Sequence, residues 1–312
     1  LGLSKDIPVS QFPAKLVLEL RSLTRKYYDL TDERSAHINK LKGDLHTVFP
    51  QYLDVFCDVT GKTSTMILRQ YGTPDKILRG HKKTMIEKIS KASRKGLAKA
   101  SERYEKLCAA ANAAKTFGCQ IDSIYFNIFL TLDLVEKLDS ALDSILNRIR
   151  QLITFNKNEK FIQQIKLLNT IPGVGFLTAV TIMCEIGDFS AFRNPKQLFA
   201  YFGLDPEVNE SGKFVGTQLH MSKRGSRIAR RAIFAVALAS IRTKRNGEGI
   251  NPYLRKYYEL KSGQKPKMVA IGAVMHKVCN IVFAVLRDEK AFELRSPEEH
   301  CKQYQRPALA AA

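Results

Sequence analysis

The sequence has no closely spaced cysteine pair and no long apolar run, and each absence excludes a class of protein. None of its six cysteines are spaced as C-x-x-C, and no histidine completes a zinc pattern. We therefore expect the reduced thiols of a cytoplasmic protein. No uninterrupted apolar run reaches the roughly 18 residues that a membrane helix needs, and no signal peptide is recognisable. No membrane partner is expected.

Acidic residues are also scarce, with 30 Asp and Glu against 50 Lys and Arg, a formal net charge of +20. A protein this basic usually meets a polyanion, because each cation near a phosphate releases condensed counterions. Residues 61–118 hold 14 bases and 4 acids, and residues 213–267 hold 14 bases and 2 acids. Two such zones predict a nucleic-acid footprint. The alternative is a generically basic protein without such a partner.

Strand signals are few, and the sequence predicts a mostly α-helical fold. Apolar residues recur at helical spacing over residues 14–49 and about 120–154, which predicts two long helices of coiled-coil character. Glycine turns begin after Asn158. We expect a self-associating helical region over 1–157, a compact domain over 158–290 and a tail over 291–312. Residues 212–220 are the best candidate for an extended segment or hairpin.

The stretch IPGVG, residues 171–175, separates two apolar segments and predicts a helix-hairpin-helix. Gly173 and Gly175 allow positive φ and carry no side chain, so backbone N–H groups at the start of the second helix can meet an anion. A nucleic-acid phosphate fits there without base contacts, which makes binding independent of sequence. The alternative is a tight turn between two core helices.

A second motif, SKRGSRIARRAIFAVA, predicts a helix that starts at a serine, with Ser222 as its N-cap. Its arginines can lie along a phosphate backbone while the other helix face is buried. The alternative is a solvated helix start, which needs a compensating anion because arginine there opposes the helix dipole. The candidate phosphate contacts are Gly173, Gly175, Lys213, Lys223, Arg224, Arg227, Arg230 and Arg231.

Several motifs together closely resemble the C-terminal domain of the IS110/IS116/IS902 transposases. They are the P-G-V-G turn, E-I-G-D (185–188), F-x-x-x-K-Q-L-x-A-Y-x-G-L-x-P (192–206), S-G-K (211–213) and S-K-R-G-S (222–226). Residues 14–49 also resemble the linker helix of that family. The resemblance covers about residues 14–290, and the motifs are far more specific together than alone.

The resemblance implies a two-part recombinase. An N-terminal RuvC-like domain would supply four acids that hold a divalent metal, and the C-terminal domain would supply a serine that becomes attached to DNA. The serine most similar in position is Ser211, with Ser222 and Ser226 as rivals in the same basic stretch. The implied partners are DNA, a noncoding RNA of the element that pairs with DNA, and further copies of the chain.

The acids are where this chain departs from the family pattern. We find no first-strand aspartate and no substitute for the four acids, and the chain starts just after the point where they would precede the linker helix. Mg²⁺ is therefore expected only for the complete family enzyme, and no metal ligand is assigned here. The chain is either the larger part of a transposase or an inactive, self-associating nucleic-acid-binding remnant. A helix-hairpin-helix repair protein fits less well, because S-G-K and S-K-R-G-S have no place in it.

Overall fold

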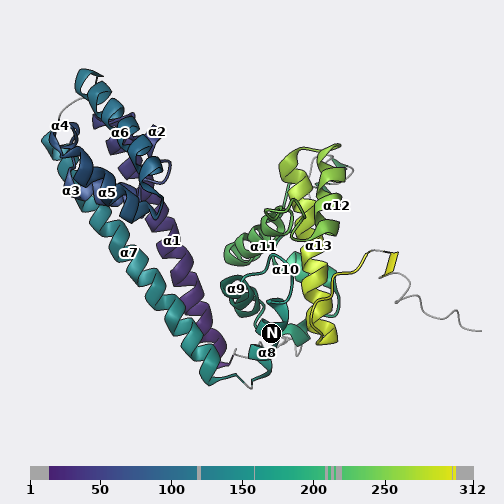
Figure 1. The fold of residues 1–312 in the computed structure, drawn as a ribbon. Coiled ribbons are helices and arrows are strands. Elements are labelled where there is room, and N and C mark those ends of the chain that lie inside the picture. The colour runs from purple at the N-terminus through teal and green to yellow at the C-terminus, as the bar shows by residue number, and fades with distance from the viewer. Residues whose placement is uncertain are drawn as a thin grey trace, which may run out of the picture. The chain divides into compact units, whose positions relative to one another are not determined.

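The computed structural model describes residues 14–117, 121–157, 159–207, 210–211, 214–215, 220–296 and 298–299. The described chain is mostly α-helical, as predicted. Its contacts divide it into two units, residues 27–145 and residues 1–26 together with 146–312. This division differs from the boundary expected at residue 158, because both junctions lie inside long helices that continue without a break. These helices are α1 (Lys15–Val48) and α7 (Asp122–Phe155) (Figure 1).

In the unit of residues 27–145, α1 and α7 run antiparallel and side by side (Figure 1). Arg34 Nε donates to Asp139 Oδ1 at 2.5 Å, and Tyr125 Oη donates to the Val48 carbonyl at 3.4 Å. One core joins both long helices to the short helices between them, with α6 packed against α2, α4 and α5. The short helices are α2 (Tyr52–Val55), α3 (Lys62–Gln70), α4 (Pro74–Arg79), α5 (Lys82–Ser93) and α6 (Leu97–Phe117).

The other unit contains the remaining helices, and its central element is the last of them. The helices are α8 (Lys160–Leu168), α9 (Phe176–Ile186), η1 (Phe189–Ala191), α10 (Pro195–Tyr201), α11 (Arg227–Ser240), α12 (Pro252–Ser262) and α13 (Lys267–Asp288). Helix α13 packs against α8, α10, α11 and α12. Its buried face, which includes Val274, Val278 and Val282, therefore forms the middle of the core.

Helix α13 bears on the prediction that the chain has no apolar run long enough to span a membrane. By length and composition its 22 residues could cross a membrane, with a mean hydropathy of 2.0 in its most apolar window. Its apolar residues do not form an uninterrupted run in the sequence, because His276 and Lys277 lie in the middle of the helix. Within the described structure 56% of that window is buried against protein. The apolar residues of α13 therefore serve as part of the core of this unit.

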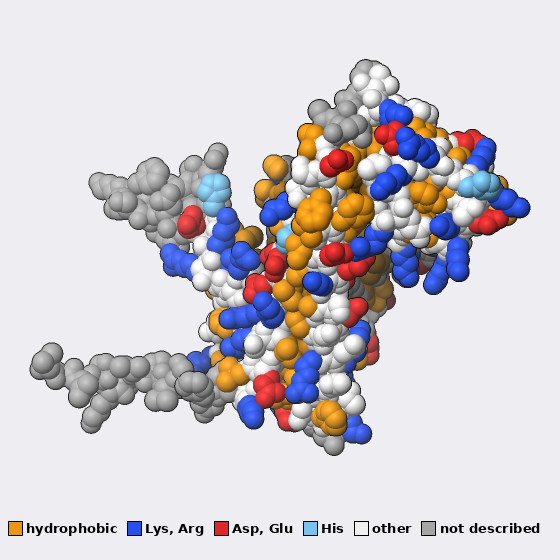
Figure 2. Space-filling view, turned by 90° about the vertical axis from the view of Figure 1, so that its left-hand side faces the viewer, with side chains coloured by type: hydrophobic (Ala, Val, Ile, Leu, Met, Phe, Trp, Pro, Cys, Tyr) orange, Lys and Arg blue, Asp and Glu red, His pale blue; other side chains and the backbone are white. Residues whose placement is uncertain are grey.

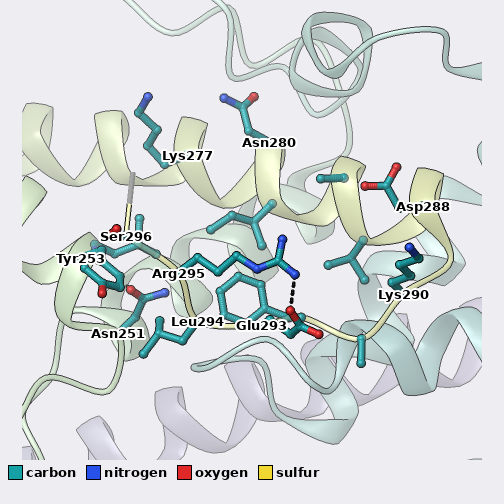
Figure 3. A pocket seen from close by; sticks show the side chains of 16 residues that line it. Asn251, Tyr253, Lys277, Asn280, Asp288, Lys290, Glu293, Leu294, Arg295 and Ser296 are labelled. Atoms are coloured by element: carbon teal, nitrogen blue, oxygen red, sulfur yellow. Dashed lines mark hydrogen bonds and ion pairs between the residues drawn. The ribbon is translucent and has the colours of Figure 1, made fainter. Parts of the chain in front are cut away.

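The segment that follows α13 belongs to the packed unit, although the tail was expected to begin at residue 291. The backbone N–H of Phe292 donates to Thr170 Oγ1 at 2.8 Å. Residues 290–296 and α13 line a cavity of about 380 Å³, where Arg295 forms an ion pair with Glu293 (Figure 3). Residue 297 and residues 300–312, the rest of the expected tail, lie outside the described residues.

Candidate nucleic-acid interface

The IPGVG turn joins α8 to α9, and its first glycine is required by packing. Gly173 has φ +96°, a conformation that side-chain-bearing residues rarely adopt. A Cβ at this position would lie 2.6 Å from Ser240 Oγ and 2.9 Å from Ser240 N. Ser240 Oγ also donates to the Pro172 carbonyl at 3.0 Å. The missing side chain of Gly173 therefore lets the end of α11 pack against the turn. This is the packing role that the sequence left open as an alternative.

The second glycine of the turn, Gly175, lies in a different environment. It is exposed, has φ −84° and is the N-cap of α9 without a side-chain cap, and a Cβ would meet nothing within 4 Å. Close by, Arg150 Cζ lies 5.9 Å from the centre of the Phe176 ring. Of the two glycines, Gly175 is the one placed where a phosphate could approach, and that contact stays a prediction.

We expect alanine at the two positions to have unequal effects. Gly173→Ala should lower the free energy of unfolding by about 1–3 kcal/mol, because it forces a left-handed backbone and a clash with Ser240. Gly175→Ala should change it by less than about 0.5 kcal/mol, because its Cβ enters open space. Urea unfolding of the two variants measures the difference. Equal losses would contradict the assigned roles.

The S-K-R-G-S motif (222–226) crosses F-G-L-D-P (202–206), the end of the motif of residues 192–206, with direct backbone contact. The N–H of Lys223 donates to the Gly203 carbonyl at 3.0 Å. A Cβ on Gly225 would lie 1.9 Å from the Tyr201 carbonyl oxygen, and one on Gly203 would lie 2.5 Å from Gly225 N. Both glycines are therefore needed for the two motifs to touch. Gly203 is also in the left-handed region, with φ +66°.

The predicted N-cap of the following helix was wrong. Helix α11 begins at Arg227, and its N-cap is Ser226, whose Oγ accepts a hydrogen bond from Ala229 N at 3.1 Å. Ser222 instead donates from Oγ to Asp205 Oδ1 at 2.5 Å. The helix starts later than expected because the intervening residues form the crossing with F-G-L-D-P.

The predicted basic residues of this motif fall into two groups. Arg230 Nη1 donates to the carbonyls of Gly225 at 2.7 Å and Phe202 at 3.2 Å, and burial lowers its pKa. Arg230 thus ties the two crossing motifs together and uses part of its donor capacity within the fold. The other group lies around the start of α11. Lys223, Arg224 and Arg227 are exposed, and Arg231 is half-buried.

A short hairpin carries the candidate nucleophile. Strand β1 (Glu210–Ser211) pairs antiparallel with β2 (Phe214–Val215), and Ser211 stands opposite Phe214. A further antiparallel bridge joins Pro206 to Met221, so the two ends of the hairpin segment pair next to the crossing of the two motifs. The Ser211 side chain and the whole of Lys213 lie outside the described residues. The role of Ser211 stays a hypothesis.

A cavity of about 470 Å³ opens beside this crossing, and its most buried charged group is Glu185, which is 3% exposed. Both carboxylate oxygens of Glu185 accept hydrogen bonds from Arg25, from Nε and Nη2 at 2.9 Å each. Burial opposes ionisation, but the bonds from Arg25 and Ser226 and the charge of Arg21 outweigh it and lower the pKa of Glu185. The lining residues are Arg21, Arg25, Glu185, Ala200, Tyr201, Arg224, Gly225 and Ser226.

Two further lining residues are held by backbone carbonyls. Arg21 Nε donates to the Cys184 carbonyl at 2.7 Å, and Tyr201 Oη donates to the Glu185 carbonyl at 2.9 Å. No role was predicted from the sequence for these residues, for Arg25 or for Glu185. One signal was available: Glu185 is the single charged residue in the otherwise apolar segment FLTAVTIMCEI, and an acid that is fully buried is almost always paired.

The described residues do not fit a Mg²⁺ site. Mg²⁺ prefers several converging oxygen ligands, and no group of three or more His, Cys, Asp or Glu in the described part of the chain could hold a metal. At the 470 Å³ cavity the Glu185 carboxylate is already bound by Arg25. We therefore derive no chemical step through a metal.

Comparison with known proteins agrees with the motifs. Residues 165–259 match the sequence model described as "Transposase IS116/IS110/IS902 family". The chain is 23% identical over 286 residues to an insertion element IS110 uncharacterized 43.6 kDa protein of Streptomyces coelicolor, covering 91% of this chain and 66% of that protein. It is 30% identical over 177 residues to the pilin gene-inverting protein of Moraxella bovis, covering 56% and 52%.

A third relative is the transposase for insertion sequence element IS1111A of Coxiella burnetii, 26% identical over 188 residues that cover 58% of this chain and 50% of that protein. The chain thus spans about half to two thirds of the length of these curated relatives. The matched residues contain the IPGVG turn, the E-I-G-D and F-G-L-D-P motifs, S-G-K and S-K-R-G-S. Residues 165–259 therefore match the IS116/IS110/IS902 transposase family in both model and motifs, and the similarity to curated relatives extends over most of the chain.

Proposed function

We propose that the chain is the DNA-binding and serine-bearing part of an insertion-sequence transposase that works in the cytoplasm. The observation that carries the proposal is the start of α11, where exposed cations lie beside the base of the hairpin that holds Ser211. The family relationship supports the same conclusion. Cations and a nucleophile on one surface are what cleavage and rejoining of a phosphodiester need.

DNA binding would rest on phosphates rather than bases. Lys223, Arg224 and Arg227 are exposed and lie within five residues of one another around the N-terminus of α11, where the helix dipole also favours an anion. Gly175 at the start of α9 offers a second approach for the backbone. Such contacts position a duplex without selecting its sequence, so selection would be left to another partner. The family resemblance makes a noncoding RNA the proposed one.

In the proposed reaction, Ser211 Oγ attacks the phosphorus of a DNA phosphodiester. A serine Oγ–phosphorus bond forms while the bond from phosphorus to the leaving deoxyribose oxygen breaks. The proton lost by the serine ends on that leaving oxygen, and Lys213 supplies a counter-charge. Attack by a deoxyribose hydroxyl on the serine phosphodiester would then form the new phosphodiester bond and break the serine Oγ–phosphorus bond, and the hydroxyl proton would return to Ser211 Oγ.

Salt dependence tests the phosphate contacts. Arg227→Ala and Arg231→Ala should weaken DNA binding equally for all sequences, and each lost contact should flatten the slope of log K against log salt by about one unit. Arg242→Ala is the matched control, because Arg242 is exposed and follows the opposite end of α11. Fluorescence anisotropy over a salt series measures the slopes. An unchanged slope would remove Arg227 and Arg231 from the footprint.

A second copy of the chain is the other partner that we propose. On α7, Phe126, Leu130 and Leu134 are 61%, 46% and 43% exposed and recur every four residues along one helix face. Hydrophobic side chains form a column on the side of the molecule drawn in Figure 2. Exposed apolar side chains along one face of a long helix are typical of a surface that associates with another protein.

A further inference from the structure

We propose that the 470 Å³ cavity beside the start of α11 binds one unpaired nucleotide of a nucleic-acid strand, with its phosphate on the arginines and its base on Tyr201. This inference rests on the proposed function, because the strand is the one that the transposase would handle. It adds a binding site for single-stranded nucleic acid, which the proposed phosphate contacts along a duplex do not require.

The charge of the cavity favours an anion. Three guanidinium groups line it, those of Arg21, Arg25 and Arg224, and the carboxylate of Glu185 is the single acid among the lining residues. The two inner arginines are held in place by the fold, Arg25 by both oxygens of Glu185 and Arg21 by the Cys184 carbonyl. Guanidinium groups that are already oriented lose less freedom when they bind a phosphate.

The start of α11 adds to this attraction. Gly225 and Ser226 form part of the cavity wall, and Ser226 is the N-cap of this 14-residue helix. The positive end of the helix dipole therefore lies at the same cavity as the arginines. Phosphate is the anion of nucleic acids that suits both guanidinium groups and a helix N-terminus.

The size and the remaining wall of the cavity point to more than a phosphate. A volume of about 470 Å³ is in the range of small-molecule sites. Tyr201 is 45% exposed, with its hydroxyl bound to the Glu185 carbonyl and its ring edge-on to Phe192 at 5.2 Å between centroids. The ring is thus held in a fixed orientation. An exposed aromatic ring beside cations is how single-stranded nucleic acids are bound, by stacking of a base.

The test uses the whole chain and a fluorescein-labelled thymidine oligonucleotide, with binding read by anisotropy. Tyr201→Leu should weaken binding about tenfold through the loss of stacking, and Tyr201→Phe, which keeps the ring, should restore it. An otherwise identical strand with abasic positions should bind the wild type and Tyr201→Leu equally. Arg224→Ala should weaken binding of both strands, because the phosphates are still present. Arg242→Ala is again the matched control.

The outcomes separate this inference from the proposed function. If Tyr201→Leu and Arg224→Ala bind the thymidine strand as tightly as Arg242→Ala does, the nucleotide site is wrong, even where duplex binding is intact. If the wild-type chain binds neither duplex nor single strand, the proposed function itself fails. Should Tyr201→Leu be unstable, the wild-type chain alone keeps the test valid, because it should bind the abasic strand about tenfold more weakly than the thymidine strand, and equal affinities would overturn the site.

Discussion

Ser211→Ala should abolish the covalent protein–DNA adduct of the active transposase, while DNA affinity stays within about twofold of wild type. The reason is that alanine removes the only atom of this side chain that can form a bond to phosphorus, whereas the cations around the start of α11 stay in place. The adduct is measured as a protein–DNA band that survives denaturing electrophoresis. Affinity is measured on the same preparation by anisotropy.

The two rival serines supply the controls. Ser222→Ala removes a hydrogen bond to Asp205, and Ser226→Ala removes the cap of α11, which should cost about 1 kcal/mol of stability. Both variants should still form the adduct. An adduct that persists in Ser211→Ala and disappears in one of the other two would assign the nucleophile to that serine instead.

Glu185→Ala should lower the free energy of unfolding by about 2–3 kcal/mol, because it leaves Arg25 and Arg21 without their buried counter-charge. We take a value below the range for fully buried pairs because the Arg25 side chain is 52% exposed while that of Glu185 is 2% exposed. The control is Glu259→Ala, which removes a surface pair with Arg255 and should cost less than about 1 kcal/mol. Urea unfolding compares the two, and equal losses would contradict a special role for Glu185.

The pH dependence of stability follows from the same carboxylate. The pKa of Glu185 is lowered in the folded protein, so its contribution is fully present above the pKa of an unfolded glutamate. That contribution is lost as the pH falls through the lower, folded-state value. The stability difference between wild type and Glu185→Gln should therefore be constant near neutral pH and shrink in acid.

The parts of the fold that were predictable from sequence are those with a local signal. Apolar periodicity over residues 14–49 and 120–154 predicted α1 and α7 nearly to their ends, because a helix face repeats within a few residues. The IPGVG turn was predicted from another local signal, its two glycines between apolar segments. The sequence could not say that Gly173 faces Ser240, because the two lie on separate helices that meet only in the folded chain.

The candidate site shows the same limit. In the segment that begins with S-K-R-G-S, the sequence predicted Ser222 as the helix cap and the arginines as phosphate contacts, and the latter stay a prediction. Ser226 caps the helix and Arg230 binds backbone carbonyls, because this segment crosses F-G-L-D-P. Arg25 and Glu185 are 160 residues apart in the sequence. A local sequence pattern cannot predict a contact between residues so widely separated.

The order of synthesis gives this last pairing a particular consequence. Residues 27–145 form one contiguous unit, whereas the unit with the cavity takes residues from both sides of it. On the ribosome, Arg21 and Arg25 emerge before that whole helical insert, and Glu185 emerges after it. Because α1 and α7 are antiparallel, folding of the insert returns the chain to its starting point and shortens the effective loop that must close. Folding of the insert before Glu185 is made would therefore lower the entropy cost of bringing Arg21 and Arg25 to this carboxylate.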